Sequence, residues 1–256
     1  MVDSHCHLQD HAFDADREEV VARALAAGVD RMLVPGFDVA SSRAAVTLAK
    51  RHPGVVSAAV GVHPHFAAEM DEPGWEEIGA LAADDGVVAV GEIGLDYFRN
   101  LSPPAVQRAA FERQLALAAR LGKPVLVHDR DAHRDIRAAL LAWSRRAQAR
   151  PAGVLHAFSG DAELALEMTA AGFLVSFALP LTFHSAAGPR EAAAAMEDGT
   201  FLTETDAPWL APGGREARNE PTTVLRVLAE LARLRHSTRE AVARSVAEAY
   251  ARLIGC

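Results

Sequence analysis

The segment VVSAAVGV, residues 55–62, is almost continuously apolar and is followed directly by His63. A strand of a parallel sheet is covered on both faces, so a short apolar run without polar alternation is the pattern expected of it. Helical patterns flank the segment, at residues 39–51 before it and 75–83 after it. The segment therefore predicts a parallel strand between two helices, which is the repeating unit of an α/β protein.

The same alternation continues along the whole chain. Further strands are expected at residues 2–8, 31–35, 87–93, 124–128, 152–157, 173–177 and 200–205. Helical patterns separate them at residues 16–27, 102–121, 135–149, 161–171 and 190–197, and two more follow at 222–235 and 238–253. This α/β order favours a (β/α)8 TIM barrel with an extra C-terminal helix over an open doubly wound sheet. No low-complexity linker divides residues 1–256, so we expect a single domain.

The amino-acid composition limits which classes of protein this chain can belong to. Of the 256 residues, 50% are hydrophobic and 23% are charged, which is typical of a globular protein with a sizeable core. The formal net charge is −8 and the only lysines are Lys50 and Lys123, which argues against tight, sequence-independent binding of nucleic acid but leaves transient contact open. No targeting segment or membrane-length apolar run is evident, and Cys6 and Cys256 give no disulfide framework. These features predict a cytoplasmic protein without membrane association, and no obligate protein partner is evident.

Seven unusual polar residues are placed at the carboxyl ends of the predicted strands. They are His5, His7, His63, Glu92, His128, His156 and Asp206. In a TIM barrel these strand ends converge on one rim, where the active sites of this architecture lie. So many buried imidazoles and carboxylates need partners, and metal ions would supply them. We therefore expect a metal site at this rim.

The number of candidate ligands favours two divalent ions. One ion would take His5, His7 and Asp206, and the other would take His128 and His156, with Glu92 as the bridge. Ions that share a carboxylate lie about 3.5 to 4 Å apart, a separation used in hydrolysis. This mix of ligands suits Mg²⁺, Mn²⁺ or Zn²⁺. Asp206 is expected to accept a proton from the attacking water.

Other residues near the strand ends have weaker claims to a role. Glu204 precedes Asp206 by two residues and so faces the same way, which makes it a candidate for contact behind the metal ligands. Cys6 is expected to point away from the metal site by strand alternation. His65 is expected to be an exposed loop residue. Aromatic side chains that could either stack on a substrate base or pack in the core are Tyr97, Phe158 and Trp209.

Six sequence blocks, together with a later Arg-Asn-Glu-Pro segment, carry a family likeness. The blocks are DSHCH (3–7), GVHP (61–64), GEIGLDY (91–97), VHDR (127–130), HAFSG (156–160) and TETDAP (203–208), and RNEP follows at 218–221. In this respect the chain resembles the TatD-type metal-dependent deoxyribonucleases over nearly its whole length. The resemblance implies a two-metal site on a TIM barrel, with the ligands named above and with His63 beside the reacting phosphate. It further implies 3′-to-5′ exonuclease activity with DNA as a transient substrate.

One segment departs from that family pattern. Residues 212–217 read PGGREA, where the family often has a Pro-His-Arg-Gly-Lys-like run, so positive charge is lost where a phosphate backbone would be held. Arg215 and Arg218 remain as the expected contacts for anionic groups. The catalytic residues expected are Asp206, Glu92 and His63.

Two other functions remain alternatives. The first is a two-metal hydrolase of a carbonyl substrate such as an aminoacyl ester, lactone or amide. Its lysine-bridged version is disfavoured because Glu92 stands on the fourth strand and both lysines lie far from it. The second is a non-catalytic binding protein, which the presence of Asp206 disfavours.

Overall fold

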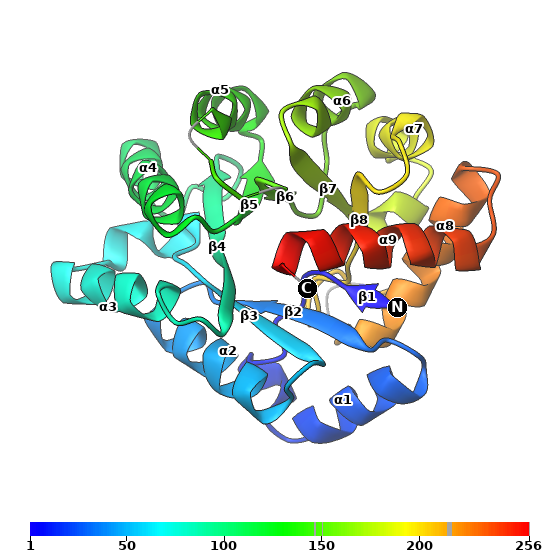
Figure 1. Cartoon of the computed structure of the whole chain (residues 1–256), viewed down its shortest axis with the longest axis horizontal. Coiled ribbons are helices and arrows are strands. Elements are labelled where there is room, and N and C mark those ends of the chain that lie inside the picture. Colours follow the sequence, from blue (N-terminus) through cyan, green and yellow to red (C-terminus); the bar gives the residue numbers. More distant parts are fainter. Residues whose placement is uncertain (146, 150, 214–216, 256) are drawn as a thin grey trace.

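The computed structural model describes residues 1–145, 147–149, 151–213 and 217–255. Within them, one eight-stranded parallel sheet has its strands in sequence order. The strands are β1 (Val2–Asp3), β2 (Arg31–Pro35), β3 (Val56–Val60), β4 (Val87–Asp96), β5 (Val125–Arg130), β6 (Gly153–Leu155), β7 (Phe173–Phe177) and β8 (Phe201–Thr203). Figure 1 shows this sheet rolled up inside a ring of helices, so the predicted TIM barrel is confirmed.

Helices follow the strands and cover the outside of the sheet (Figure 1). They are α1 (Arg17–Ala26), α2 (Val39–Arg51), α3 (Glu72–Ala82), α4 (Pro104–Leu121), α5 (His133–Ser144), α6 (Ala162–Ala170), α7 (Ala187–Ala195), α8 (Val224–Leu234) and α9 (Arg239–Ile254). Local signals set several ends: the Asp161 side chain accepts a hydrogen bond from the Leu164 N–H, and Gly122 ends α4 in the left-handed region. The helix expected at residues 135–149 is shorter in the structure and is shifted toward the N-terminus, since α5 runs from His133 to Ser144.

The barrel is closed between β8 and β1. The Ser4 N–H donates to the Thr203 carbonyl at 2.9 Å, and the Thr203 hydroxyl donates to the Val2 carbonyl at 2.8 Å. The first strand was expected to extend to residue 8, but β1 has only two residues. Beyond it the backbone bonds to neighbouring loops instead, since the Asp206 N–H donates to the His5 carbonyl at 2.9 Å. The seam therefore continues past the strands as loop-to-loop pairing.

Helix α9 lies across the end of the barrel at which the strands begin. Ser245 on this helix accepts a hydrogen bond from the Gly199 N–H, just before β8, at 2.7 Å. Val246, Ala249 and Tyr250 on the same helix are buried. Figure 1 shows α9 crossing the middle of the barrel in projection. One barrel end is thus covered, and the functional site lies at the other. Among the described residues, no helix combines the length and apolarity that a membrane crossing needs.

Candidate metal centre

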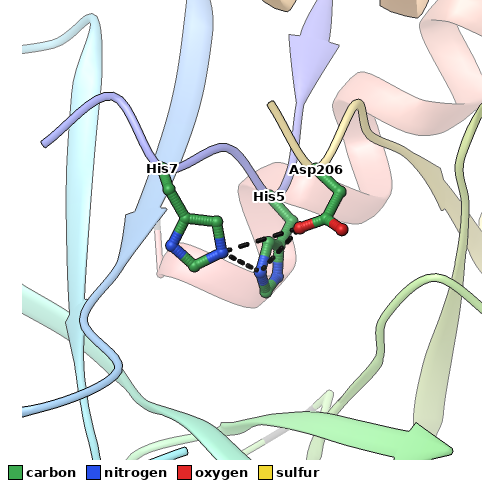
Figure 2. A group of neighbouring side chains, drawn as sticks. All are labelled: His5, His7 and Asp206. Atoms are coloured by element: carbon green, nitrogen blue, oxygen red, sulfur yellow. Dashed lines mark hydrogen bonds and ion pairs between the residues drawn. The ribbon is translucent and has the colours of Figure 1, made fainter. Parts of the chain in front are cut away.

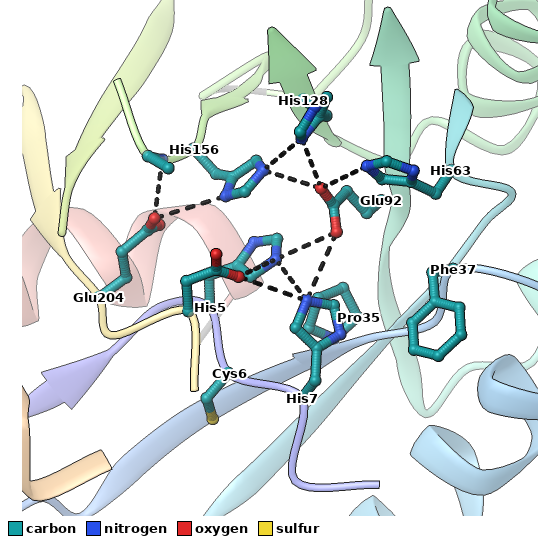
Figure 3. A network of polar contacts seen from close by, with 12 residues as sticks. His5, Cys6, His7, Pro35, Phe37, His63, Glu92, His128, His156 and Glu204 are labelled. Carbon is teal, nitrogen blue, oxygen red and sulfur yellow. Dashed lines mark hydrogen bonds and ion pairs between the residues drawn. The ribbon is translucent and has the colours of Figure 1, made fainter. Parts of the chain in front are cut away.

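Glu92 lies at the centre of the polar cluster (Figure 3) and is only 3% exposed. An irregularity in β4 aims this side chain inward, because the pairing between β4 and β5 shifts register between Val90 and Ile93. The Glu92 N–H is thereby released from the sheet ladder, and it donates to the Gly36 carbonyl, after β2, at 2.8 Å. The carboxylate can therefore face ligands from both sides of the barrel.

Gly94 brings β4 close to β5 beside the cluster. It has a φ of +143°, and a Cβ atom built on it would lie 2.0 Å from the His128 carbonyl oxygen. Any other residue would push the two strands apart at this level. This glycine therefore sets the close spacing of Glu92 and His128.

The first half of the cluster joins the segments that follow the first and the last strand of the barrel (Figure 2). We call it the seam group, and it consists of His5, His7 and Asp206 with the Oε2 atom of Glu92. The Nε2 atoms of His5 and His7 are 3.1 Å apart and lie 3.3 and 3.5 Å from Glu92 Oε2. Asp206 Oδ1 is 3.9 Å from His5 Nε2 and 3.6 Å from His7 Nε2. The structure thus brings together the residues that were predicted to share one ion.

The second half of the cluster gathers on the other oxygen of Glu92 (Figure 3). We call it the strand group, and it consists of His128 and His156 with Glu92 Oε1. Glu92 Oε1 lies 3.0 Å from His128 Nδ1 and 2.8 Å from His156 Nε2, and these two nitrogens are 3.2 Å apart. The carboxylate thus presents one oxygen to each group, as the expected bridge requires.

These spacings fit divalent ions. Four ligand atoms about 2.1 Å from one ion, at tetrahedral angles, lie about 3.4 Å from one another. The separations between ligand atoms run from 3.1 to 3.9 Å in the seam group and from 2.8 to 3.2 Å in the strand group. Imidazole nitrogens and carboxylate oxygens that face one another at such distances are typical of the ligands of a metal site.

His63 faces the strand group but is held as a hydrogen-bond donor. Its Nδ1 accepts the His65 backbone N–H at 3.1 Å, which places the ring proton on Nε2. That Nε2 atom lies 3.4 Å from Glu92 Oε1. Burial holds the pKa of His63 well below its usual range, so the ring is neutral. A protonated Nε2 has no lone pair for a metal, and this favours contact with substrate.

Charges in the cluster attract cations. Burial alone would raise the pKa of Glu92, but the surrounding histidines, with His156 the strongest, hold it well below its usual range. Burial likewise opposes protonation of His7, yet its hydrogen bonds with Asp206 and Glu92 raise its pKa to about 9. The carboxylates therefore draw in positive charge, which a metal ion would supply.

The loop that carries Asp206 is braced on both sides. Asp206 has a left-handed φ of +56°, which is uncommon for a residue with a side chain. The Asp3 carboxylate accepts hydrogen bonds from the Thr205 N–H at 2.9 Å and from its hydroxyl at 2.6 Å. Asn219, 1% exposed, donates to the Thr205 carbonyl at 2.9 Å. In the sequence, Asp3 and Asn219 were identified only as parts of motifs. Asp3 could have been recognised as a functional candidate, because it is a charged residue inside a predicted apolar strand.

Two further carboxylates lie behind the strand group. Glu204 Oε1 is 3.4 Å from His156 Nδ1, which agrees with the contact expected behind the ligands. Asp96, which sequence reasoning did not single out, lies behind His128. His65 was expected to be an exposed loop residue, but its Nε2 lies 2.7 Å from Asp96 Oδ2 and its side chain is only 19% exposed. It belongs to the polar network because the turn after His63 folds it back over β4.

The expected anion-binding arginines lie in a different setting. Arg215 is outside the described residues. Arg218 is already engaged, since its guanidinium donates to both carboxylate oxygens of Asp16 at 2.6 and 2.7 Å and to Glu220 at 2.9 Å. These bonds tie the loop after β8 to the start of α1. In the structure, Arg218 therefore braces the loop after β8, and its N–H donors already have partners.

Apolar side chains surround the centre in different ways. Cys6 is buried and points away from the cluster (Figure 3), as strand alternation predicted, and Phe158 packs in the core. Trp209 is 46% exposed, and its ring centroid lies 4.6 Å from that of His7. Other exposed large apolar residues in loops at this rim are Phe98, Leu101, Phe183 and Leu210. One exposed aromatic ring, that of Trp209, therefore lies beside the candidate metal ligands.

Comparison with known proteins gives a consistent picture. The family model described as TatD related DNase matches residues 2–255. The chain is 37% identical over 254 residues to a protein named uncharacterized metal-dependent hydrolase YabD from Bacillus subtilis (strain 168), covering 99% of this chain and 98% of the relative. It is 38% identical over 241 residues to the 3′-5′ ssDNA/RNA exonuclease TatD of Cronobacter sakazakii, covering 92% and 90%. The solved structure of YJJV, a TatD homologue from Escherichia coli K12, superposes with a TM-score of 0.92 at 29% identity, covering 100% and 98%.

Proposed function

The chain belongs to the TatD-related DNase family of metal-dependent hydrolases, and on that premise we propose that it removes nucleotides from the 3′ ends of single-stranded DNA or RNA at a centre of two divalent ions. The observation that carries this proposal is the placement of the Glu92 carboxylate, because its two oxygens face two separate groups of imidazoles. A single ion would leave one of these groups without a cation. We assign one ion to the seam group and the other to the strand group.

Ions bound there would acidify a water molecule and offset the negative charge of a phosphodiester. Asp206 is the proton acceptor in this proposal. Its side chain is 17% exposed, against 4% for Glu92, so it is the cluster carboxylate that substrate and water reach. Asp206 Oδ1 faces the histidines, which leaves its second oxygen to take up a proton.

His63 supplies a hydrogen bond to the substrate. Its ring is neutral and carries the proton on Nε2, because Nδ1 accepts the His65 N–H and so cannot be the protonated nitrogen. A phosphate oxygen that approaches the ions from this side would accept that proton in a hydrogen bond. This agrees with the position beside the reacting phosphate that the family resemblance implied.

The exposed ring of Trp209 favours a nucleic-acid end over a small carbonyl substrate. Trp209 lies beside His7 with nearly half of its surface exposed. Stacking of a base on an aromatic ring is independent of sequence and suits a strand whose bases are unpaired. A protein with net negative charge that binds its substrate in this way needs no extended basic surface, because the metal ions bound at its centre would offset the negative charge of the phosphate.

The test uses purified protein stripped with EDTA and reloaded with Mg²⁺, Mn²⁺ or Zn²⁺. A single-stranded oligonucleotide labelled at its 5′ end should give a ladder of shortening products, and a phosphorothioate at the 3′ end should block it. The same phosphorothioate at the 5′ end is the matched control and should not. Degradation from the 5′ end contradicts the polarity, and turnover of ester or lactone substrates without any cleavage of nucleic acid contradicts the substrate class.

A further inference from the structure

The two halves of the cluster differ in what stands behind their histidines. In the strand group, the ring nitrogen that points away from Glu92 faces a buried carboxylate in both cases. His128 Nε2 lies 3.4 Å from Asp96 Oδ2, in a hydrogen bond. His156 Nδ1 lies 3.4 Å from Glu204 Oε1, which is within ion-pair distance, although the geometry gives this nitrogen no hydrogen bond among the described residues. Asp96 is 2% exposed and Glu204 is fully buried. Each carboxylate favours the ring tautomer whose lone pair points at Glu92.

Asp96 is held so that it cannot turn away from His128. Its Oδ2 also lies 2.7 Å from His65 Nε2, and its Oδ1 accepts the Arg99 N–H at 2.7 Å. The buried Gln107 grips its backbone, accepting the Asp96 N–H at 2.8 Å and donating to the Asp96 carbonyl at 3.0 Å. The carboxylate is therefore fixed from three directions.

Glu204 is fixed in the same manner behind His156. Its Oε1 accepts the Ala157 N–H at 2.7 Å, and its Oε2 accepts a hydrogen bond from the Ser176 hydroxyl. Ser176 in turn pairs with Ser4 at 3.1 Å. Both carboxylates are thus prearranged by the fold.

The seam group has no such backing. His5 Nδ1 is buried and, in the part of the chain that the structure describes, has neither a hydrogen-bond partner nor a carboxylate within ion-pair distance. Among the described residues, the one polar neighbour of His7 Nδ1 is the Gln9 amide nitrogen, 3.5 Å away, and that nitrogen donates to the Pro35 carbonyl at 2.7 Å. Neither imidazole has its tautomer set by a carboxylate.

We propose that Asp96 is a positioning residue for His128 and that, together with Glu204, it makes the strand group the tighter metal site, which fills first. A histidine whose outer ring nitrogen faces a buried carboxylate is a more basic ligand and is already oriented before the ion arrives. Two negative charges stand behind the strand group, whereas the seam group adds the single charge of Asp206 as a direct ligand. The two-ion assignment on which this inference rests is that of the proposed function.

The experiment is a titration of the EDTA-stripped protein with Mn²⁺ alone, followed by calorimetry and by electron paramagnetic resonance. The wild-type protein should bind two ions in two resolved steps, with the signal of an isolated ion after the first step and a spin-coupled signal after the second. Replacing His128 with Ala should remove the tight step. Replacing His5 with Ala should remove the weak step and leave the tight one.

Asp96→Asn keeps the shape of the side chain and removes its charge. It should weaken the first step by about 10-fold to 100-fold and leave the second step nearly unchanged. Asp129→Asn is the matched control, because Asp129 is also a poorly exposed carboxylate at the end of β5 but lies 2.7 Å from His133, outside the cluster. Circular dichroism of each variant in EDTA checks that the barrel is folded.

The inference would be overturned by an unchanged first step in Asp96→Asn, by an equal loss in Asp129→Asn, or by loss of the tight step in His5→Ala. Two wild-type ions of equal affinity would also contradict it while leaving the two-metal function intact. A wild-type protein that binds one ion contradicts the two-metal function instead. In that case the effect of Asp96→Asn on the single ion still decides the role of Asp96.

Discussion

The rim of the barrel and its ring of helices are both rich in charged side chains, but they hold them in opposite ways. At the rim, imidazoles and carboxylates are buried and crowd together around Glu92. In the ring, arginines pair with carboxylates of a neighbouring helix in partly exposed ion pairs. Examples are Arg51–Glu18, Arg43–Glu77, Arg113–Glu72, Arg137–Glu167 and Arg190–Glu230.

The energetic consequences differ just as much. A buried charge that loses its partner costs several kcal/mol, whereas an exposed ion pair contributes about 0 to 1 kcal/mol. The rim is therefore where a single substitution should abolish a function, and the ring is where it should change stability slightly. Substitutions in the two regions can test this difference.

The largest effect is expected from Glu92→Gln. This change keeps the side-chain shape but removes the charge that both groups share, so both ions should bind much more weakly. Loss of charge stabilisation worth several kcal/mol corresponds to a fall in turnover of about 10⁴-fold. Metal content by mass spectrometry, together with cleavage of single-stranded DNA, measures it. A variant that still held two ions would show that Glu92 is not the bridge.

Asp206→Asn is expected to have the next largest effect. An amide cannot accept the proton of the attacking water, so turnover should fall by about 10³-fold, within the range of general base catalysis. Asp16→Asn is a control outside the cluster, since Asp16 pairs with Arg218 at the start of α1. Retained cleavage in the Asp206 variant would disprove the assigned role.

The two regions also differ in how far their residues could be predicted from the sequence. Strand β7 and helix α2 have the bounds that their apolar patterns indicated, because burial on the sheet dictates those patterns. The seven cluster residues were placed at the strand ends by the same logic. Asp96 was not singled out, because its role depends on which nitrogen of His128 turns toward it. Nor did the pattern show that Arg218 pairs with Asp16, a residue 202 positions away.

Trp209→Ala should have a moderate effect, which should be confined to the binding of nucleic acid. Stacking of one base is worth about 1 to 3 kcal/mol, so KM for single-stranded DNA should rise by about 5-fold to 150-fold. Hydrolysis of bis(p-nitrophenyl) phosphate, which has no base to stack, should change little. Leu166→Ala, which removes an exposed apolar side chain from α6 in the ring, is the control. An equal loss on both substrates would mean that Trp209 acts by supporting His7.

Glu230→Gln should have the smallest effect, because Glu230 belongs to the helix ring. Hydrogen bonding to Arg233, with a further contribution from Arg190 of α7, lowers the pKa of Glu230 from 4.5 to about 2. A carboxyl group with a depressed pKa in the folded state stabilises the protein above its unfolded-state pKa, and that stability is lost as pH falls through the folded-state value. The variant should therefore be less stable than the wild type by about 1 kcal/mol at pH 7.

The difference between the two proteins should shrink between pH 4.5 and pH 2, because the wild-type carboxyl then becomes protonated and resembles the amide. Urea unfolding in EDTA at pH 7 and pH 3 measures this, with Glu248→Gln as the control, since Glu248 has no ion-pair partner among the described residues. Acid protonates the rim histidines of both proteins equally, so their contribution cancels in the comparison. A difference that persisted undiminished at pH 3 would show that packing of the side chain, rather than its charge, joins α7 to α8.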